Sequence, residues 1–218
     1  MLDTNELKRW FDVIKNILFD VHIAYNNKRR LQQFHPTEAK IARRGFFRHH
    51  QYQLSFIIAV QLCKLFGNSR NQQHNFFALL NKLEADEYAD DLLELLRENE
   101  KKKDLDEWFY CREDILSEVT TIRKELAEHS DIIDKFVYAR DKLFAHEDIH
   151  RDTIVIKQQD YIALLRLASS IFNRLHGKLF RAEVNYDDTP DWDIGEILTV
   201  IVDYYRLLDE REHRKRDS

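Results

Sequence analysis

The sequence predicts an all-α protein, and three observations carry that prediction. Residues that break regular structure are rare, with only 4 Gly and 2 Pro in 218 residues. Charged residues make up 33% of the chain and hydrophobic residues 44%, which is typical of long helices with one solvated and one buried face. Apolar residues also recur at helical spacing through most of the chain. We therefore expect a helical bundle with an extra C-terminal helix.

The first half of the chain predicts two long helices and then two shorter ones. The first long helix is expected over about 4–26, where Asn residues end the apolar stripe. The second is expected over 37–66, with a Thr as N-cap at its start and Gly67 as its stop signal. A short helix over about 71–82 and an acidic helix over about 85–103 should follow.

The second half predicts four more helices. A long helix is expected over 105–128, and the next begins with Ser130 as its N-cap. Residues 153–156 have strand-like composition but stand alone, so we expect an extended connection there. Helical periodicity returns over 158–179 and, after a polar linker, over 193–214.

The length and composition of the chain indicate its domain organisation and its cellular compartment. We expect one helical domain over 1–180, and over 181–218 a linker and a C-terminal helix that packs on the bundle or on a dimer partner. Cys63 and Cys111 are isolated, which indicates a reducing compartment. The charged N-terminal segment has no apolar signal region, and the longest apolar run, 56–60, is too short to span a bilayer. These features predict a soluble cytoplasmic protein with no membrane partner.

Charge is distributed unevenly along the chain, although the net charge is only -5. Residues 27–51 hold seven basic groups and one acid, whereas 84–107 hold eleven acids and four bases. Arg43, Arg44 and Arg48 lie among aromatic residues, a combination that suits RNA because phosphates need cations and unstacked bases need flat partners. We take these three arginines as candidate RNA-binding residues. The alternative is a solvated helix face over a core of aromatic rings.

The segment 130–150, SDIIDKFVYARDKLFAHEDIH, holds the strongest candidates for chemistry. On one helix, Arg140 and His146 would lie about 120° apart in rotation and about 9 Å apart along the axis. Two such helices meeting at a dimer twofold could bring two Arg and two His into one cleft. Histidine exchanges protons near neutral pH and arginine binds phosphate oxygens, which suffices for metal-free cleavage of RNA. The alternative is a salt-bridge arrangement at a helix end.

Two neighbouring residues could assist this pair. Asp141 could hold the guanidinium of Arg140 or the imidazole in place, which makes it a candidate supporting residue. Lys142 lies one helical turn before His146 and could add positive charge for RNA binding. Either residue could instead simply face solvent.

The run YARDKLFAHED resembles the signature of the HEPN superfamily: an Arg followed by Asp or Asn, a short spacer and a His, near the end of a helix in a small bundle. Its form is most similar to abortive-infection U-type HEPN proteins. The resemblance extends through the predicted helix ending at Phe66 and the segment 74–80, and covers residues 1 to about 180.

This resemblance implies a HEPN-type bundle and a metal-independent endoribonuclease without cofactor. The protein would act as a homodimer in phage defence or as a toxin, with an antitoxin protein as a possible partner. Arg140 and His146 would be its catalytic residues. The family also includes members that have lost catalysis and bind RNA, nucleotide or protein, and that alternative stays open.

A second motif overlaps the first. His146-Glu147-x-x-His150 matches the H-E-x-x-H pattern, in which both His bind Zn²⁺ and the Glu activates water. The segment is crowded with charge, the helix is expected to end there, and only His176 or Glu183 could be proposed as a third ligand. A zinc hydrolase is therefore the third interpretation, and we expect no metal.

Overall fold

The computed structural model describes residues 1–33, 38–67, 73–101, 108–141, 156–186 and 193–216. Within these residues the regular structure is helical, and a single isolated bridge joins Leu2 to Tyr88. The all-α prediction is therefore confirmed. No helix in the described ranges is long and apolar enough to cross a membrane.

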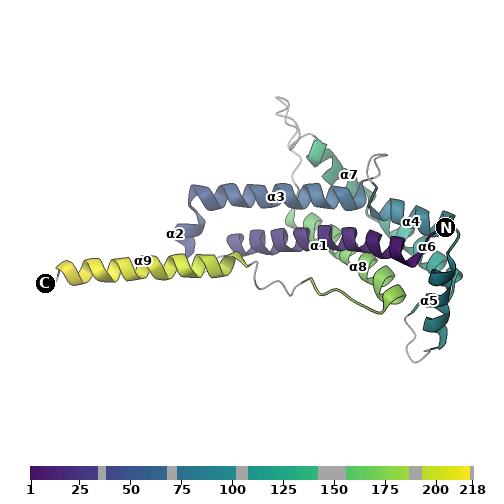
Figure 1. Ribbon diagram of the computed structural model, residues 1–218. Helices are drawn as coiled ribbons and strands as arrows, with labels where there is room; N and C mark the ends of the chain where they lie inside the picture. Colours follow the sequence, from purple (N-terminus) through teal and green to yellow (C-terminus); the bar gives the residue numbers. More distant parts are fainter. Residues whose placement is uncertain (34–37, 68–72, 102–107, 142–155, 187–192, 217–218) are drawn as a thin grey trace.

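The helices form an elongated bundle with one long helix leaving it (Figure 1). In chain order they are α1 (Thr4–Gln32), α2 (Ala39–Ala42), α3 (Gly45–Phe66), α4 (Phe76–Ala85), α5 (Asp90–Lys101), α6 (Arg112–Glu128), α7 (Ser130–Ala139), α8 (Gln158–Phe180) and α9 (Ile194–Arg216). Helices α1 and α3 pack antiparallel and α8 packs against both of them. Helix α7 rises obliquely over α3, and α9 extends past the far end of α1 (Figure 1).

Helix α1 is the central helix of the core. Asp3 caps it by accepting a hydrogen bond from the backbone N–H of Glu6, at 2.6 Å. The helix continues to Gln32, so the expected end near residue 26 was wrong. Leu31 is fully buried in the last turn, and Arg30 forms a two-point ion pair with Glu38 (2.6 and 2.8 Å). These tertiary contacts stabilise an extra turn that the polar residues there did not predict.

The expected single helix over 37–66 is two helices, α2 and α3. The chain breaks at Arg43 and Arg44, and Arg44 adopts an extended conformation (φ -66°, ψ 154°) before α3 begins. The Arg44 guanidinium donates a hydrogen bond to the Tyr205 hydroxyl (2.7 Å) and lies 4.8 Å from the centre of its ring. This cation–π contact with α9 accompanies the break.

Three predicted helix starts were placed too early, and one of them is α5, which was expected from about residue 85 and begins at Asp90. Helix α4 begins at Phe76, because Asn75 caps it by accepting from the backbone N–H of Ala78 at 2.7 Å. Helix α6 begins at Arg112, because the Asp114 carboxylate accepts from two preceding backbone N–H groups, at 2.9 and 3.1 Å. The starts of α4 and α6 follow from side-chain caps rather than from apolar periodicity.

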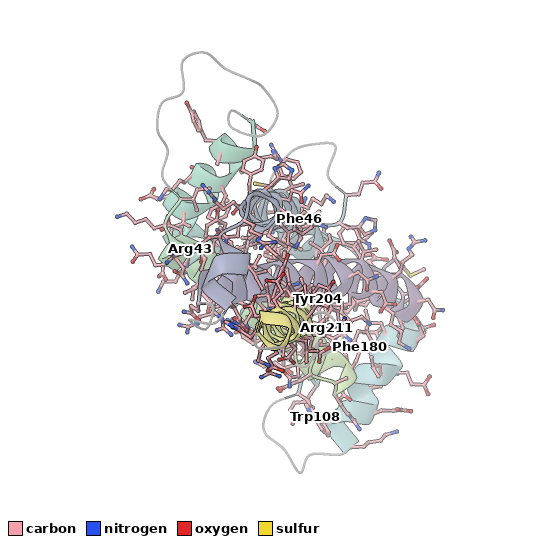
Figure 2. All side chains as sticks on the ribbon, turned by 90° about the vertical axis from the view of Figure 1, so that its left-hand side faces the viewer. Arg43, Phe46, Trp108, Phe180, Tyr204 and Arg211 are labelled. Atoms are coloured by element: carbon pink, nitrogen blue, oxygen red, sulfur yellow. The ribbon has the colours of Figure 1, made fainter. Side chains whose placement is uncertain are left out.

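The C-terminal helix was predicted closely, at 193–214 against the observed Ile194–Arg216. Its first turns pack on α1 and α2, where Ile194 and Leu198 are buried and the Ile194 N–H donates to Asn27 at 3.0 Å. Further along, apolar side chains such as Val200 and Tyr204 are exposed, and Figure 2 views this helix end-on.

Candidate functional site

Helix α7 leads directly to the candidate arginine. A single residue, His129, both ends α6 and precedes α7, and its carbonyl accepts from the Ile133 N–H at 3.0 Å. Ser130 is therefore the first helical residue, and its predicted role as N-cap was wrong. Helix α7 buries Ile133 and Phe136, and Phe136 packs edge-on against Tyr161 of α8 with ring centres 5.1 Å apart. This packing holds α7 in place, and Arg140 directly follows the last residue of that helix.

Arg140 directly follows the last residue of α7. The regular helix ends at Ala139, and the Arg140 backbone stays helical (φ -58°, ψ -50°), with its N–H donating to the Phe136 carbonyl. Arg140 is half-buried, with 27% of its side chain exposed.

Asp141 holds the guanidinium of Arg140, as the sequence suggested for a supporting residue. The Arg140 Nε donates to Asp141 Oδ1 at 2.7 Å, and this bond raises the pKa of Arg140 above its already high ordinary value. Arg140 is consequently a permanent cation. The ion pair fixes one edge of the guanidinium and leaves its two terminal nitrogens without a partner among the described residues.

Cys63 of α3 is buried near this ion pair and was not a sequence candidate. Burial raises the pKa of its thiol to about 12, although the nearby Arg140 charge opposes that rise. The thiol is therefore neutral at physiological pH and is a packing group rather than a nucleophile. Its helix, α3, packs against α7, which leads to Arg140.

Arg140 and Asp141 stand at the edge of a cleft of about 600 Å³. The cleft lies where the end of α3, the start of α4, α6 and α7 converge. It is lined by Phe66, Gly67, Phe77, Arg123, Leu126, Ala127, Ser130, Ile133, Asp134, Val137, Arg140 and Asp141. Ile133, Asp134, Val137 and Arg140 recur at helical spacing in the sequence, and that spacing indicated that they share one side of α7, which forms one wall of the cleft. The residues from the other helices carried no such signal.

The remaining signature residues lie outside the described residues. These are His146 and Lys142, and with them Glu147 and His150 of the zinc pattern. The pairing of Arg140 with His146 therefore stays a prediction. In the described part of the chain, no three His, Cys, Asp or Glu side chains come together as a metal site would require. His176, a candidate third ligand in the zinc interpretation, packs on Phe172 and hydrogen-bonds the Ala182 carbonyl at 2.6 Å.

The three basic candidates lie at the other end of α3. Arg43 and Arg44 form the α2–α3 corner, and the Arg48 Nε donates to the Arg43 carbonyl at 3.2 Å. Only Arg48 is on a helix, whereas Arg43 and Arg44 lie in the break of the helix that was expected over 37–66. Phe46 is 73% exposed (Figure 2), whereas Phe47 belongs to the core, so the alternative of a core ring holds for Phe47 alone of these two.

The α2–α3 corner lies far from the cleft that Arg140 lines. Cys63 follows Arg48 by fifteen positions on α3, which corresponds to about 22 Å along the helix. A strand of RNA contacting both places would have to run along α3. The structure thus brings together Arg140, Asp141 and the cleft, and it leaves the basic corner as a separate surface.

Comparison with known proteins gave no relatives. No protein-family model, curated protein or solved structure matches this chain.

Proposed function

We propose that this protein is a metal-independent endoribonuclease of the HEPN type, with Arg140 and His146 as its catalytic residues. The observation that carries the proposal is the state of Arg140. It is a permanent cation, held by Asp141 directly after α7, and it lines a cleft. A guanidinium in that state is suited to bind the phosphate of an RNA strand and to stabilise the charge that develops in the transition state.

The reaction needs only proton transfer and charge stabilisation. A base takes the proton of a ribose 2′-hydroxyl while its oxygen forms a bond to the neighbouring phosphorus. The bond from phosphorus to the 5′-oxygen breaks, and that oxygen takes a proton from an acid. The products are a 2′,3′-cyclic phosphate and a 5′-hydroxyl. Histidine serves as base and as acid near neutral pH, so a second copy of the chain that supplies a second His146 would complete the set.

The proposed biological setting follows from the signature YARDKLFAHED alone. We place the protein in the cytoplasm as a homodimeric toxin or phage-defence ribonuclease that an antitoxin protein could restrain. Arg43, Arg44 and Arg48 are proposed to bind RNA phosphates away from the reacting bond, with Lys142 as an additional contact nearer to it.

A second candidate function is a HEPN module that binds RNA or nucleotide without cleaving it. The observation that favours it is the ion pair of Arg140 with Asp141, because a carboxylate at 2.7 Å offsets part of the charge that catalysis needs. Both candidate functions use the same cleft, and they differ only in whether Arg140 takes part in cleavage of the bound RNA.

Cleavage of labelled RNA in excess chelator tests the first candidate. We expect products with 2′,3′-cyclic phosphate and 5′-hydroxyl ends, at a rate that added Mg²⁺ or Zn²⁺ does not change. Binding without cleavage would support the silent module. Activity that disappears with chelator and returns with Zn²⁺ would contradict the proposal.

A further inference from the structure

We propose that the cleft beside Arg140 is a nucleobase pocket that holds a guanine, with the phosphate of the same nucleotide on Arg140. This inference names the substrate group at the site of the proposed function and rests on that function. It is carried by three observations on the described residues: an apolar floor, one guanidinium with unused donors, and one unpaired carboxylate.

The floor of the cleft suits a flat, uncharged ring. Phe66 from the end of α3 and Phe77 from the start of α4 contribute aromatic rings, and Leu126, Ile133 and Val137 add aliphatic surface. RNA bases stack on such surfaces whatever their identity. The volume of about 600 Å³ lies within the range of small-ligand sites and accommodates a nucleotide.

The two arginines of the cleft differ in what they have left to donate. Arg123 donates to both carboxylate oxygens of Glu84, at 2.9 and 2.5 Å, and to Asn81 at 2.7 Å, so its charge is matched within the protein. Arg140 has one recorded bond, from Nε to Asp141, and keeps its terminal nitrogens. An anionic group of a ligand would therefore bind at the Arg140 end of the cleft.

Asp134 supplies the selective contact. This exposed residue of α7 lines the cleft, and its carboxylate has no hydrogen-bond or ion-pair partner within the described ranges. An ionised carboxylate only accepts hydrogen bonds, and it can accept two in parallel. Guanine presents two adjacent donors, N1–H and N2–H, on its Watson–Crick edge. Adenine and cytosine place an acceptor beside their amino group, and uracil flanks one N–H with two carbonyls.

The spacing of the two polar groups fits one nucleotide. Asp134 of α7 and Arg140, which directly follows α7, are six positions apart, about 9 Å along the helix axis and about 120° around it, and both line the cleft. The base edge and the phosphate of a nucleotide are separated by a comparable span. Asp134 would bind the base edge, the apolar floor its face, and Arg140 its phosphate.

Binding of 5′-GMP, 5′-AMP, 5′-CMP and 5′-UMP to the full chain, measured by calorimetry, tests this pocket without requiring catalysis. We expect GMP to bind at least about tenfold more tightly than the other three, as a charge-assisted hydrogen-bond pair would give. Asp134→Asn should remove the preference, whereas Asp131→Asn, which changes an exposed acid one turn away on α7, should keep it. Ala127→Trp, at an exposed position on the cleft wall, should block all four nucleotides.

Equal affinity for the four nucleotides, or a GMP preference that survives Asp134→Asn, would overturn the pocket. The result is separable from the proposed function. GMP binding that depends on Asp134 in a protein that cleaves no RNA would support the pocket and contradict the nuclease. Cleavage that shows no preference for guanosine and is unchanged by Asp134→Asn would support the nuclease and contradict the pocket.

Discussion

Arg140 combines a fixed position with an open donor edge, and both properties come from its neighbours. Asp141 accepts a hydrogen bond from Arg140 Nε at 2.7 Å, and Arg140 lines the cleft. Cys63 illustrates the opposite case, a reactive residue type made inert by burial. A residue type in a sequence thus indicates a possible chemical role, and the surroundings of that residue determine whether it can fill the role.

We predict that Cys63 resists thiol reagents in the folded protein. Burial holds its pKa at about 12, against an ordinary value of 9.0, so at pH 8 the reactive thiolate is scarce. The exposed Cys111 should react and Cys63 should react only on unfolding, so a colorimetric titration should count one thiol in native protein and two in denaturant. Two fast-reacting thiols in the native protein would contradict the burial of Cys63 on α3.

The same pKa sets the sign of a stability effect at high pH. Below pH 9 the thiol is protonated in both the folded and the unfolded chain, and its contribution to stability is complete. As pH rises from about 9 through about 12, only the unfolded chain loses the proton, so that stability is lost. Cys63→Ala should reduce this alkaline loss.

Among the helices, the pairing of α6 with α8 depends on a compact ionic cluster. Glu118 of α6 accepts from Lys178 at 2.6 Å and from Arg174 at 2.8 Å, and Arg174 also binds Glu125. The Glu118 side chain is only 11% exposed. Burial alone would raise the pKa of Glu118, but the bonds from Lys178 and Arg174 outweigh burial and lower it.

We predict that Glu118→Gln lowers the free energy of unfolding by about 2 kcal/mol at pH 7, since it leaves two cations without their shared carboxylate. Because the folded pKa of Glu118 lies below 4.5, this stability is present above pH 4.5 and is lost as pH falls further. Urea unfolding of both proteins at pH 7 and pH 3 measures it. Glu128→Gln, which removes an exposed ion pair with Lys124, should cost less than about 0.5 kcal/mol.

Helix interiors could be predicted from the sequence, whereas several helix ends could not. Apolar spacing fixed the buried faces of α1 and α8, because periodicity is a local property of the chain. The end of α1 depends on Leu31 packing, and the start of α6 on hydrogen bonds to Asp114. The break before α3 accompanies a contact of Arg44 with α9, far away in sequence.

The same division holds at the candidate site. Arg140 and His146 were predicted on one helix, and the structure places Arg140 directly after the last residue of α7 with Asp141 beside it, while the segment that holds His146 lies outside the described residues. The cleft could not be predicted, because Phe66, Phe77 and Leu126 reach it from three other helices. A local motif can identify a reacting group, but the pocket beside it depends on how the helices pack.

At the scale of the whole molecule, the uneven charge of the sequence becomes a separation in space. The basic α2–α3 corner lies at one end of the elongated bundle and the acidic α5 at the other (Figure 1). The exposed Phe46 and the arginines share the first end, where α9 leaves the bundle (Figure 2). An RNA strand would be attracted to that end and repelled from the other.

We predict that replacing Arg43, Arg44 and Arg48 by Gln weakens binding to all RNA sequences alike. Each lost phosphate contact should flatten the dependence of log affinity on log salt by about 0.7 on single strands. The corner is remote from Arg140, so cleavage at saturating RNA should change much less. The matched control is a triple variant that removes the exposed charges of Arg97, Lys101 and Lys124. If both triple variants and wild type show the same dependence of affinity on salt, the α2–α3 corner is not an RNA-binding site.

The most direct test of the central claim is the single-turnover rate of RNA cleavage, in chelator, by wild type, Arg140→Ala and His146→Ala. All three proteins should give the same helical circular dichroism and thermal midpoint, since Arg140 is only half-buried. We predict that each replacement lowers the rate at least about 100-fold, the usual loss when a group that transfers protons or stabilises the transition state is removed. Lys124→Ala, an exposed cation on α6, should cleave at the wild-type rate. Undiminished cleavage by folded His146→Ala or Arg140→Ala would contradict the claim that these two residues carry the chemistry.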